Sequence, residues 1–176
     1  MNDHDDHEHG LRRQRALMIG HGALMIFAGL LAGFAFLFDL IGEMTLWPIP
    51  GSITVDLPGD TRAWRAAHTG NIMNGLMIIG VGLALPLLRL SARARPFVVW
   101  GLVLTVWGNF GFYLLSALGA SGRGLSFGPN RFGGGDALSV LAFLVGYPGA
   151  FVAPIVLLLV ARGAFREARA ARAEEG

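Results

Sequence analysis

The chain has 176 residues, of which 53% are hydrophobic and only 15% are charged, and its mean hydropathy is +0.55. A soluble domain carries roughly 25% charged residues, so this composition excludes an ordinary soluble protein and indicates an integral membrane protein. Cysteine is absent, which excludes disulfides, thiolate catalysis, iron–sulfur clusters and thiolate-bound haem. The basic pI comes from arginines that flank apolar runs, so we attribute it to membrane topology and expect no nucleic-acid partner.

Residues 1–11 form an acidic, histidine-rich tail that we expect to be disordered, with scavenging of a divalent metal as the alternative role. Residues 12–163 are expected to form one transmembrane domain, followed by a basic tail over residues 164–176. The domain contains four apolar runs long enough to cross a bilayer, at about residues 16–41, 64–88, 96–118 and 136–160. In the loop after the first run, residues 52–56 alternate as a short strand would.

Arginine clusters before the first run, between the second and third runs, and after the fourth. The positive-inside rule therefore places both termini in the cytoplasm, which is consistent with an even number of crossings. We predict an all-α membrane protein, a bundle of four transmembrane helices.

Two features of the first run concern helix packing. Gly29 and Gly33 form a Gly-x-x-x-Gly pair, which lets another helix approach closely. His21, about one turn inside the cytoplasmic end, is either an interfacial or helix-bonded histidine or a second group of a site. We favour the structural role for His21.

The second run carries a histidine and two asparagines, His68, Asn71 and Asn74, to membrane depth, where polar side chains are costly and usually mark a site. On a helix they occupy successive neighbouring faces. In the third run Asn109 and Tyr113 are four residues apart and share one face. We therefore expect one imidazole, one phenol and two or three carboxamides to converge on a single pocket.

The donor set narrows the chemistry of this pocket. A single neutral imidazole suits haem iron, whereas zinc requires three or four ligands. No Ser-His-Asp pattern and no mid-span carboxylate supports nucleophilic catalysis or a proton relay. The alternative is that His68 only bonds a neighbouring helix, and periodicity alone favours that structural role.

Several segments together resemble the styrene oxide isomerase family, in the same order and at nearly the same spacing. They are Gly-His-Gly-Ala-Leu-Met-Ile-Phe at 20–27, Trp-Arg-Ala-Ala-His-Thr-Gly at 64–70, Asn-Gly-Leu-Met at 74–77, Trp-Gly-Asn-Phe-Gly-Phe-Tyr-Leu at 107–114, Arg-Gly-Leu-Ser-Phe-Gly-Pro-Asn at 123–130, Phe-Gly at 132–133 and Gly-Asp at 135–136. The segment at 123–130 is the most specific of them.

The resemblance implies a multi-pass enzyme of the inner membrane that converts styrene oxide to phenylacetaldehyde. It implies a homotrimer with haem b at the subunit interface, His68 as the axial ligand, and Asn74 and Tyr113 positioning the epoxide oxygen. Ring opening of an aryl epoxide requires a Lewis acid on oxygen, which ferric haem would provide, and a hydride then migrates to the benzylic carbon in a Meinwald rearrangement. A styrene monooxygenase is the implied functional partner, because the epoxide is its product.

The resemblance departs at Thr105, where a relative carries an acidic residue, and this leaves a substrate-shape difference open. Asn109, Asn71, Thr105 and His21 are secondary candidates for the pocket. The alternative function is a haem-binding, cytochrome b-like electron-transfer protein in which His21 and His68 both ligate the iron. A non-enzymatic membrane assembly protein is a third possibility.

Overall fold

The computed structural model of the protein describes residues 3–45 and 47–175, and it is predominantly helical. Its elements are α1 (Asp3–Ile41), β1 (Glu43–Met44), β2 (Ile53–Thr54), α2 (Thr61–Ala84), η1 (Leu85–Leu87), α3 (Ala94–Ala117), η2 (Ser121–Gly124) and α4 (Ala137–Glu174). The helices α1 to α4 are each long and apolar enough to cross a membrane. The prediction of an all-α protein with four transmembrane helices is confirmed.

The predicted N-terminal tail differs from the structure, because it is largely helical, and the basic C-terminal tail is largely helical as well. α1 begins at Asp3, so helix replaces the disorder expected over residues 1–11, of which Met1 and Asn2 lie outside the described residues. α4 continues to Glu174 and takes in most of the predicted tail at 164–176. Extending a helix adds one hydrogen bond per residue without a new nucleus, and the Ala, Arg and Glu residues after position 160 are strong helix formers.

The predicted short strand at residues 52–56 is present as β2. It pairs antiparallel with β1, with Glu43 opposite Thr54 and Met44 opposite Ile53. This small hairpin caps the end of α1 and leads the chain into α2.

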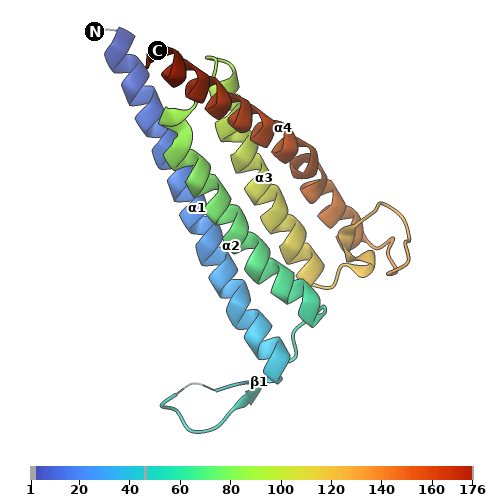
Figure 1. Ribbon diagram of the computed structural model, residues 1–176. Helices are drawn as coiled ribbons and strands as arrows, with labels where there is room; N and C mark the ends of the chain where they lie inside the picture. Colours follow the sequence, from blue (N-terminus) through green and yellow to red (C-terminus); the bar gives the residue numbers. More distant parts are fainter. Residues whose placement is uncertain (1–2, 46, 176) are drawn as a thin grey trace.

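The four helices stand side by side in sequence order (Figure 1). α1 packs along α2, α3 packs along α4, and a less extensive contact between α2 and α3 joins the two pairs. Among the described residues α1 and α4 make at most a weak contact with each other, so they form the two edges of the row. Both termini lie at one end of the molecule, and the hairpin lies at the other (Figure 1).

Glycines bring α1 and α2 into backbone contact. A Cβ on Gly75 would stand 2.6 Å from the carbonyl oxygen of Gly22, and a Cβ on Gly29 would stand 2.7 Å from Cγ1 of Ile72. Any larger side chain at these positions would push the helices apart. The predicted packing role of the Gly29 and Gly33 pair is confirmed, and it places α1 directly beside the polar segment of α2.

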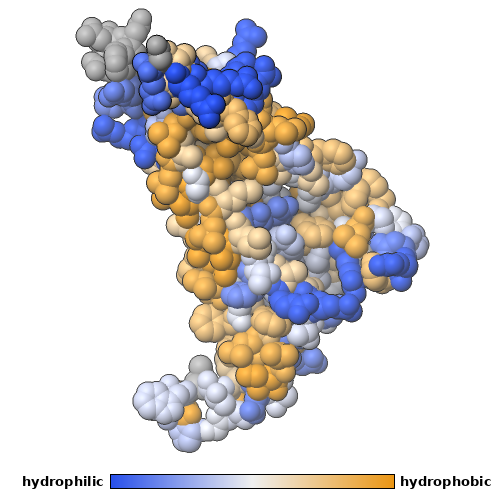
Figure 2. Space-filling model, in the orientation of Figure 1, coloured by the Kyte–Doolittle hydropathy of each residue, from blue (hydrophilic) through white to orange (hydrophobic). Residues whose placement is uncertain are grey.

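The apolar residues divide between a core and an outer belt. The core includes the fully buried Met25, Ile78, Leu102 and Val106, which join α1, α2 and α3. Many large apolar side chains of α1 and α4 remain exposed, and Figure 2 shows them as a belt below the hydrophilic end that carries the termini. Such a belt is expected where lipid or a second protein copy, and not water, covers the surface.

Candidate active site

Two loop contacts determine where α2 begins, and thereby the position of His68. The Asp60 carboxylate caps the helix by accepting a 2.8 Å hydrogen bond from the backbone N–H of Ala63. The indole N–H of Trp64 donates a 2.9 Å hydrogen bond to the carbonyl of Pro58. His68 then follows about two turns into the helix.

His68 is held against α1 through one nitrogen. Its Nδ1 lies 2.8 Å from the carbonyl oxygen of Gly29, which can only accept, so Nδ1 carries the proton. In the neutral ring Nε2 therefore keeps its lone pair. A Cβ on Gly33 would stand 2.6 Å from the same Nδ1, so the ring occupies the space that this glycine leaves. The result is an oriented imidazole with a free ligating nitrogen.

Asn74 and Asn109 meet between α2 and α3. The side-chain Nδ2 of Asn109 donates a 3.3 Å hydrogen bond to Oδ1 of Asn74. Nδ2 of Asn74 is buried and has no hydrogen-bond partner among the described residues. A buried donor without an acceptor is costly, so this amide is available to a ligand oxygen.

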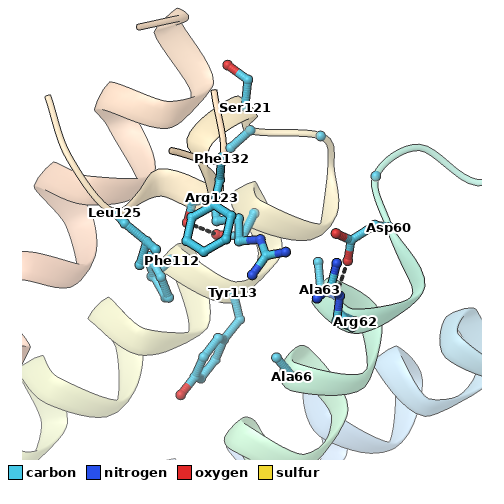
Figure 3. Close-up of a pocket in the computed structure, with 14 residues that line it drawn as sticks. Asp60, Arg62, Ala63, Ala66, Phe112, Tyr113, Ser121, Arg123, Leu125 and Phe132 are labelled. Atoms are coloured by element: carbon cyan, nitrogen blue, oxygen red, sulfur yellow. Dashed lines mark hydrogen bonds between the residues drawn. The ribbon is translucent and has the colours of Figure 1, made fainter. Parts of the chain in front are cut away.

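Tyr113 crosses the same helix contact one turn away. A Cβ on Gly70 of α2 would stand 2.6 Å from Cζ of Tyr113 and 2.9 Å from its hydroxyl oxygen. The half-buried ring borders a cavity of about 570 Å³ at the end of the molecule opposite the termini. In Figure 3 the hydroxyl points away from Arg62 and Arg123, and it makes no hydrogen bond within the described residues. The phenol can therefore donate to a ligand.

The two arginines beside Tyr113 were not expected in a site. Arg62 and Arg123 line the same cavity from α2 and η2. Arg123 adopts a φ of 59°, its guanidinium lies 4.0 Å from the ring centre of Phe132, and its carbonyl accepts a 3.2 Å hydrogen bond from the Ser116 hydroxyl. Two signals were available in the sequence. Few arginines occur at this end of the molecule, and Arg123 opens the segment at 123–130, which we used only for the family resemblance.

One chain does not bring all the predicted site residues together. His68 faces α1, whereas Gly70, against which Tyr113 packs, lies about 200° further round α2. Asn74, Asn109 and Tyr113 gather at the contact of α2 with α3. The expectation that these groups and His68 converge on a single pocket is therefore wrong for one chain, because the helix places them on different sides.

Asn71 and Thr105 do not line the cavity beside Tyr113. Asn71 is 2% exposed, its Oδ1 is unpartnered among the described residues, and it borders a separate apolar cavity of about 260 Å³ between α1, α2 and α3. Thr105 is buried at the contact with α4, where its hydroxyl donates to the carbonyl of Gly101 at 2.8 Å and Gly149 packs on its backbone. Thr105 therefore serves helix packing.

The neutral ring of His21 is the opposite tautomer to that of His68. The indole N–H of Trp107 donates to Nδ1 of His21 at 3.1 Å, so the neutral ring carries its proton on Nε2. While this bond is made, neither nitrogen of the neutral His21 offers a free lone pair. The contact supports the helix-bonded role over that of a second ligand.

Four helices long and apolar enough to cross a membrane, two of which carry most of the polar side chains described above, define a multi-pass membrane protein. A model of the styrene oxide isomerase family matches residues 14–165. A styrene-oxide isomerase of Pseudomonas fluorescens is 40% identical over 131 residues, which cover 74% of this chain and 76% of that protein. The chain belongs to the styrene oxide isomerase family, and it is an isomerase.

Proposed function

We propose that this protein isomerises aryl epoxides to aldehydes, styrene oxide to phenylacetaldehyde being the reaction that the family name suggests. We further propose that it does so with haem b held by His68. The observation that carries the proposal is the hydrogen bond between Nδ1 of His68 and the Gly29 carbonyl, because it leaves Nε2 free to ligate iron.

The surroundings of His68 fit a haem ligand. Metal-bound histidines usually donate their other N–H to a carbonyl or carboxylate, as His68 does to Gly29. The ring is also clamped by Gly33, so little rotational freedom is lost when a ligand binds. When bound, ferric haem would supply an open coordination position that acts as a Lewis acid toward the epoxide oxygen.

Asn74 and Tyr113 supply hydrogen bonds to that oxygen as it gains negative charge. The Nδ2 of Asn74 is a buried donor without a partner, and Asn109 holds the other side of the amide. The Tyr113 hydroxyl is likewise uncommitted among the described residues. Donors placed in this way lower the barrier because their bonds strengthen as charge develops.

The reaction requires no other reactant. The benzylic carbon–oxygen bond breaks, a hydride moves from the neighbouring carbon to the benzylic carbon, and that neighbouring carbon becomes the aldehyde carbonyl. The apolar spans around the site exclude water, which would otherwise trap the cation as a diol.

The geometry of α2 supports a site shared between subunits. Because His68 and the pair Asn74 and Tyr113 lie on different sides of this helix, a ligand held by His68 of one copy would meet the donors of another. We propose the homotrimer with haem at its subunit interface on this ground, with the number three taken from the family resemblance. The exposed apolar faces of α1 and α4 provide surface for such contacts.

The family resemblance and the distribution of arginine support proposals for the membrane, the orientation of the termini and the source of the substrate. We propose the inner membrane as the location, with both termini cytoplasmic because arginine concentrates at the end that carries them. A styrene monooxygenase would supply the epoxide.

The contacts of His21 favour the isomerase over the electron-transfer alternative, which requires a second histidine ligand. His21 is engaged by Trp107, and it lies eight residues, or about 12 Å along α1, from the carbonyl that holds His68. The bond from Trp107 therefore favours the helix-bonded role of His21 over that of a second iron ligand.

The test compares His68→Ala with the matched variant His21→Ala. We expect purified wild-type protein and His21→Ala to show a Soret band and to convert styrene oxide to phenylacetaldehyde, measured by gas chromatography. His68→Ala should lose most of the band and all turnover. Full haem content and normal turnover in His68→Ala would refute the ligand assignment.

A further inference from the structure

The connection between α2 and α3 is fastened to α4 at the end of the molecule that carries the termini. The backbone N–H of Arg89 donates a 3.2 Å hydrogen bond to the carbonyl of Gly163. A Cβ on Gly163 would stand 2.9 Å from Cδ2 of Leu90, so the glycine lets the connection pack closely. Arg89 is therefore held beside the arginines that follow Gly163 on α4.

Two clefts flank this junction and share two arginines. The first, of about 570 Å³, is lined by Arg89, Leu90, Ser91, Arg166, Arg169 and Ala170. The second, of about 480 Å³, is lined by Leu158, Ala161, Arg162, Phe165, Arg166 and Arg169. Arg166 and Arg169 border both clefts, so four arginines from two separate elements line this junction.

No carboxylate whose side chain the structure describes pairs with these four arginines. Arg89, Arg162, Arg166 and Arg169 are exposed, and none forms an ion pair with a carboxylate of the described residues. The positive-inside rule accounts for arginine at this end of the molecule, but it does not require arginines of two elements to border the same clefts. Like charges held together repel, so the arrangement favours a bound anion.

The clefts also have an apolar side. Leu158 is 70% exposed and Phe165 is 68% exposed, and both line the second cleft beside the arginines. Ser91 adds a hydroxyl whose oxygen accepts from the N–H of Ala94, which leaves its O–H to donate. A ligand that matches both sides carries a phosphate and an acyl chain.

We propose that this junction is a binding site for an anionic phospholipid of the leaflet at the terminal end. The phosphate lies among Arg89, Arg166 and Arg169, and the acyl chains run along Leu158 and Phe165. Because four arginines line the junction, it carries enough positive charge for two phosphates, and diphosphatidylglycerol should bind more tightly than phosphatidylglycerol. Basic pockets between transmembrane helices bind such head groups in general.

The test measures lipid binding to the full chain in detergent by native mass spectrometry and by thermal stability. Diphosphatidylglycerol and phosphatidylglycerol should bind and raise the melting temperature, whereas phosphatidylcholine and inorganic phosphate should do so far less. The triple variant Arg89→Gln, Arg166→Gln, Arg169→Gln should lose about fivefold in affinity per arginine, or about 100-fold in all. The control triple Arg12→Gln, Arg13→Gln, Arg172→Gln removes the same charge at the same end and should bind nearly as wild type.

Three results would overturn the proposal. Equal binding of phosphatidylcholine would mean that the charges do not select the lipid. Equal stabilisation by inorganic phosphate would identify a simple anion site without an acyl component. An equal loss in the control triple would show that net charge, and not the junction, attracts the lipid. If the first triple does not fold, the single variant Arg166→Gln, which touches both clefts, gives the same comparison with Arg172→Gln.

Discussion

The imidazole of His68 occupies the space where Gly33 has no side chain. A Cβ on residue 33 would stand 2.6 Å from Nδ1 and 2.8 Å from Cε1 of the ring. The same Nδ1 donates to Gly29 one turn earlier on α1, so one helix both orients and confines the histidine of the next. The glycine pair thus does more than let two helices approach, because it holds the proposed iron ligand.

Gly33→Ala should reduce haem binding although His68 is still present. The added methyl group must displace the imidazole and weaken its hydrogen bond to Gly29, so Nε2 no longer points as in the native site. We expect a lower Soret absorbance per protein and a proportional loss of turnover. Gly20→Ala is the matched control, because nothing lies within 4 Å of a Cβ at that position of α1. Equal haem content in the two variants would contradict the clamp.

Asn74→Ala should retain haem and lose activity. Removal of a donor to a developing oxyanion typically costs about 10²–10³ in rate. Asn109→Ala removes only the group that holds Oδ1 of Asn74, and one neutral hydrogen bond is worth about tenfold, so its effect should be smaller. Single-turnover rates with the Soret band as the haem control test this order. A larger effect at Asn109 would assign the direct contact to that residue.

The spans could be predicted from the sequence because each is an apolar run that must satisfy its backbone internally in lipid. The ends of the helices could not be predicted, because the Arg-rich and Ala-rich segment after residue 160 continues α4 as helix. Charge patterns mark where the membrane stops, but a helix can continue beyond it.

The candidate site residues were predicted as polar groups at membrane depth, but their grouping was not. The ring orientations of His68 and His21 depend on Gly29 and Trp107, which lie 39 and 86 residues away in the chain. No local pattern specifies such partners. The angle between His68 and Gly70 around the helix follows from the sequence alone. Which neighbouring helix covers each side of α2 does not, and for this reason we expected all the polar groups to meet in one pocket of one chain.

Asp136 predicts a pH dependence of stability. A hydrogen bond from the Ser121 side chain, followed by those from the backbone N–H groups of Ser139 and Ser121, lowers the pKa of this carboxyl below its ordinary value near 3.8. The ionised carboxylate therefore stabilises the fold above pH 3.8, and this contribution is lost as the pH falls through the lowered pKa.

Asp136→Asn should accordingly melt at a lower temperature than wild type at pH 7. The gap should close as the pH falls through the lowered pKa of Asp136, because the wild-type carboxyl then becomes protonated as well. Asp56→Asn, in an exposed loop position, is the control and should follow the wild-type profile. A gap that stays constant down to pH 3 would show that the cap acts through shape and not through charge.

Tyr113→Phe separates catalysis from cofactor binding most directly, because it removes one oxygen atom and leaves the packing on Gly70 in place. The hydroxyl has no partner within the described residues, so its loss leaves no orphaned acceptor there and should hardly change the melting temperature. If the phenol donates to the epoxide oxygen, turnover should fall by about 10²–10³ with the Soret band unchanged.

Tyr147→Phe is the matched control, since the chain has two tyrosines and Tyr147 is half-exposed between Phe143 and Phe151 on α4. Loss of haem in Tyr113→Phe would move this residue into the cofactor site. Equal activity of the two variants would show that the oxygen is polarised without the phenol.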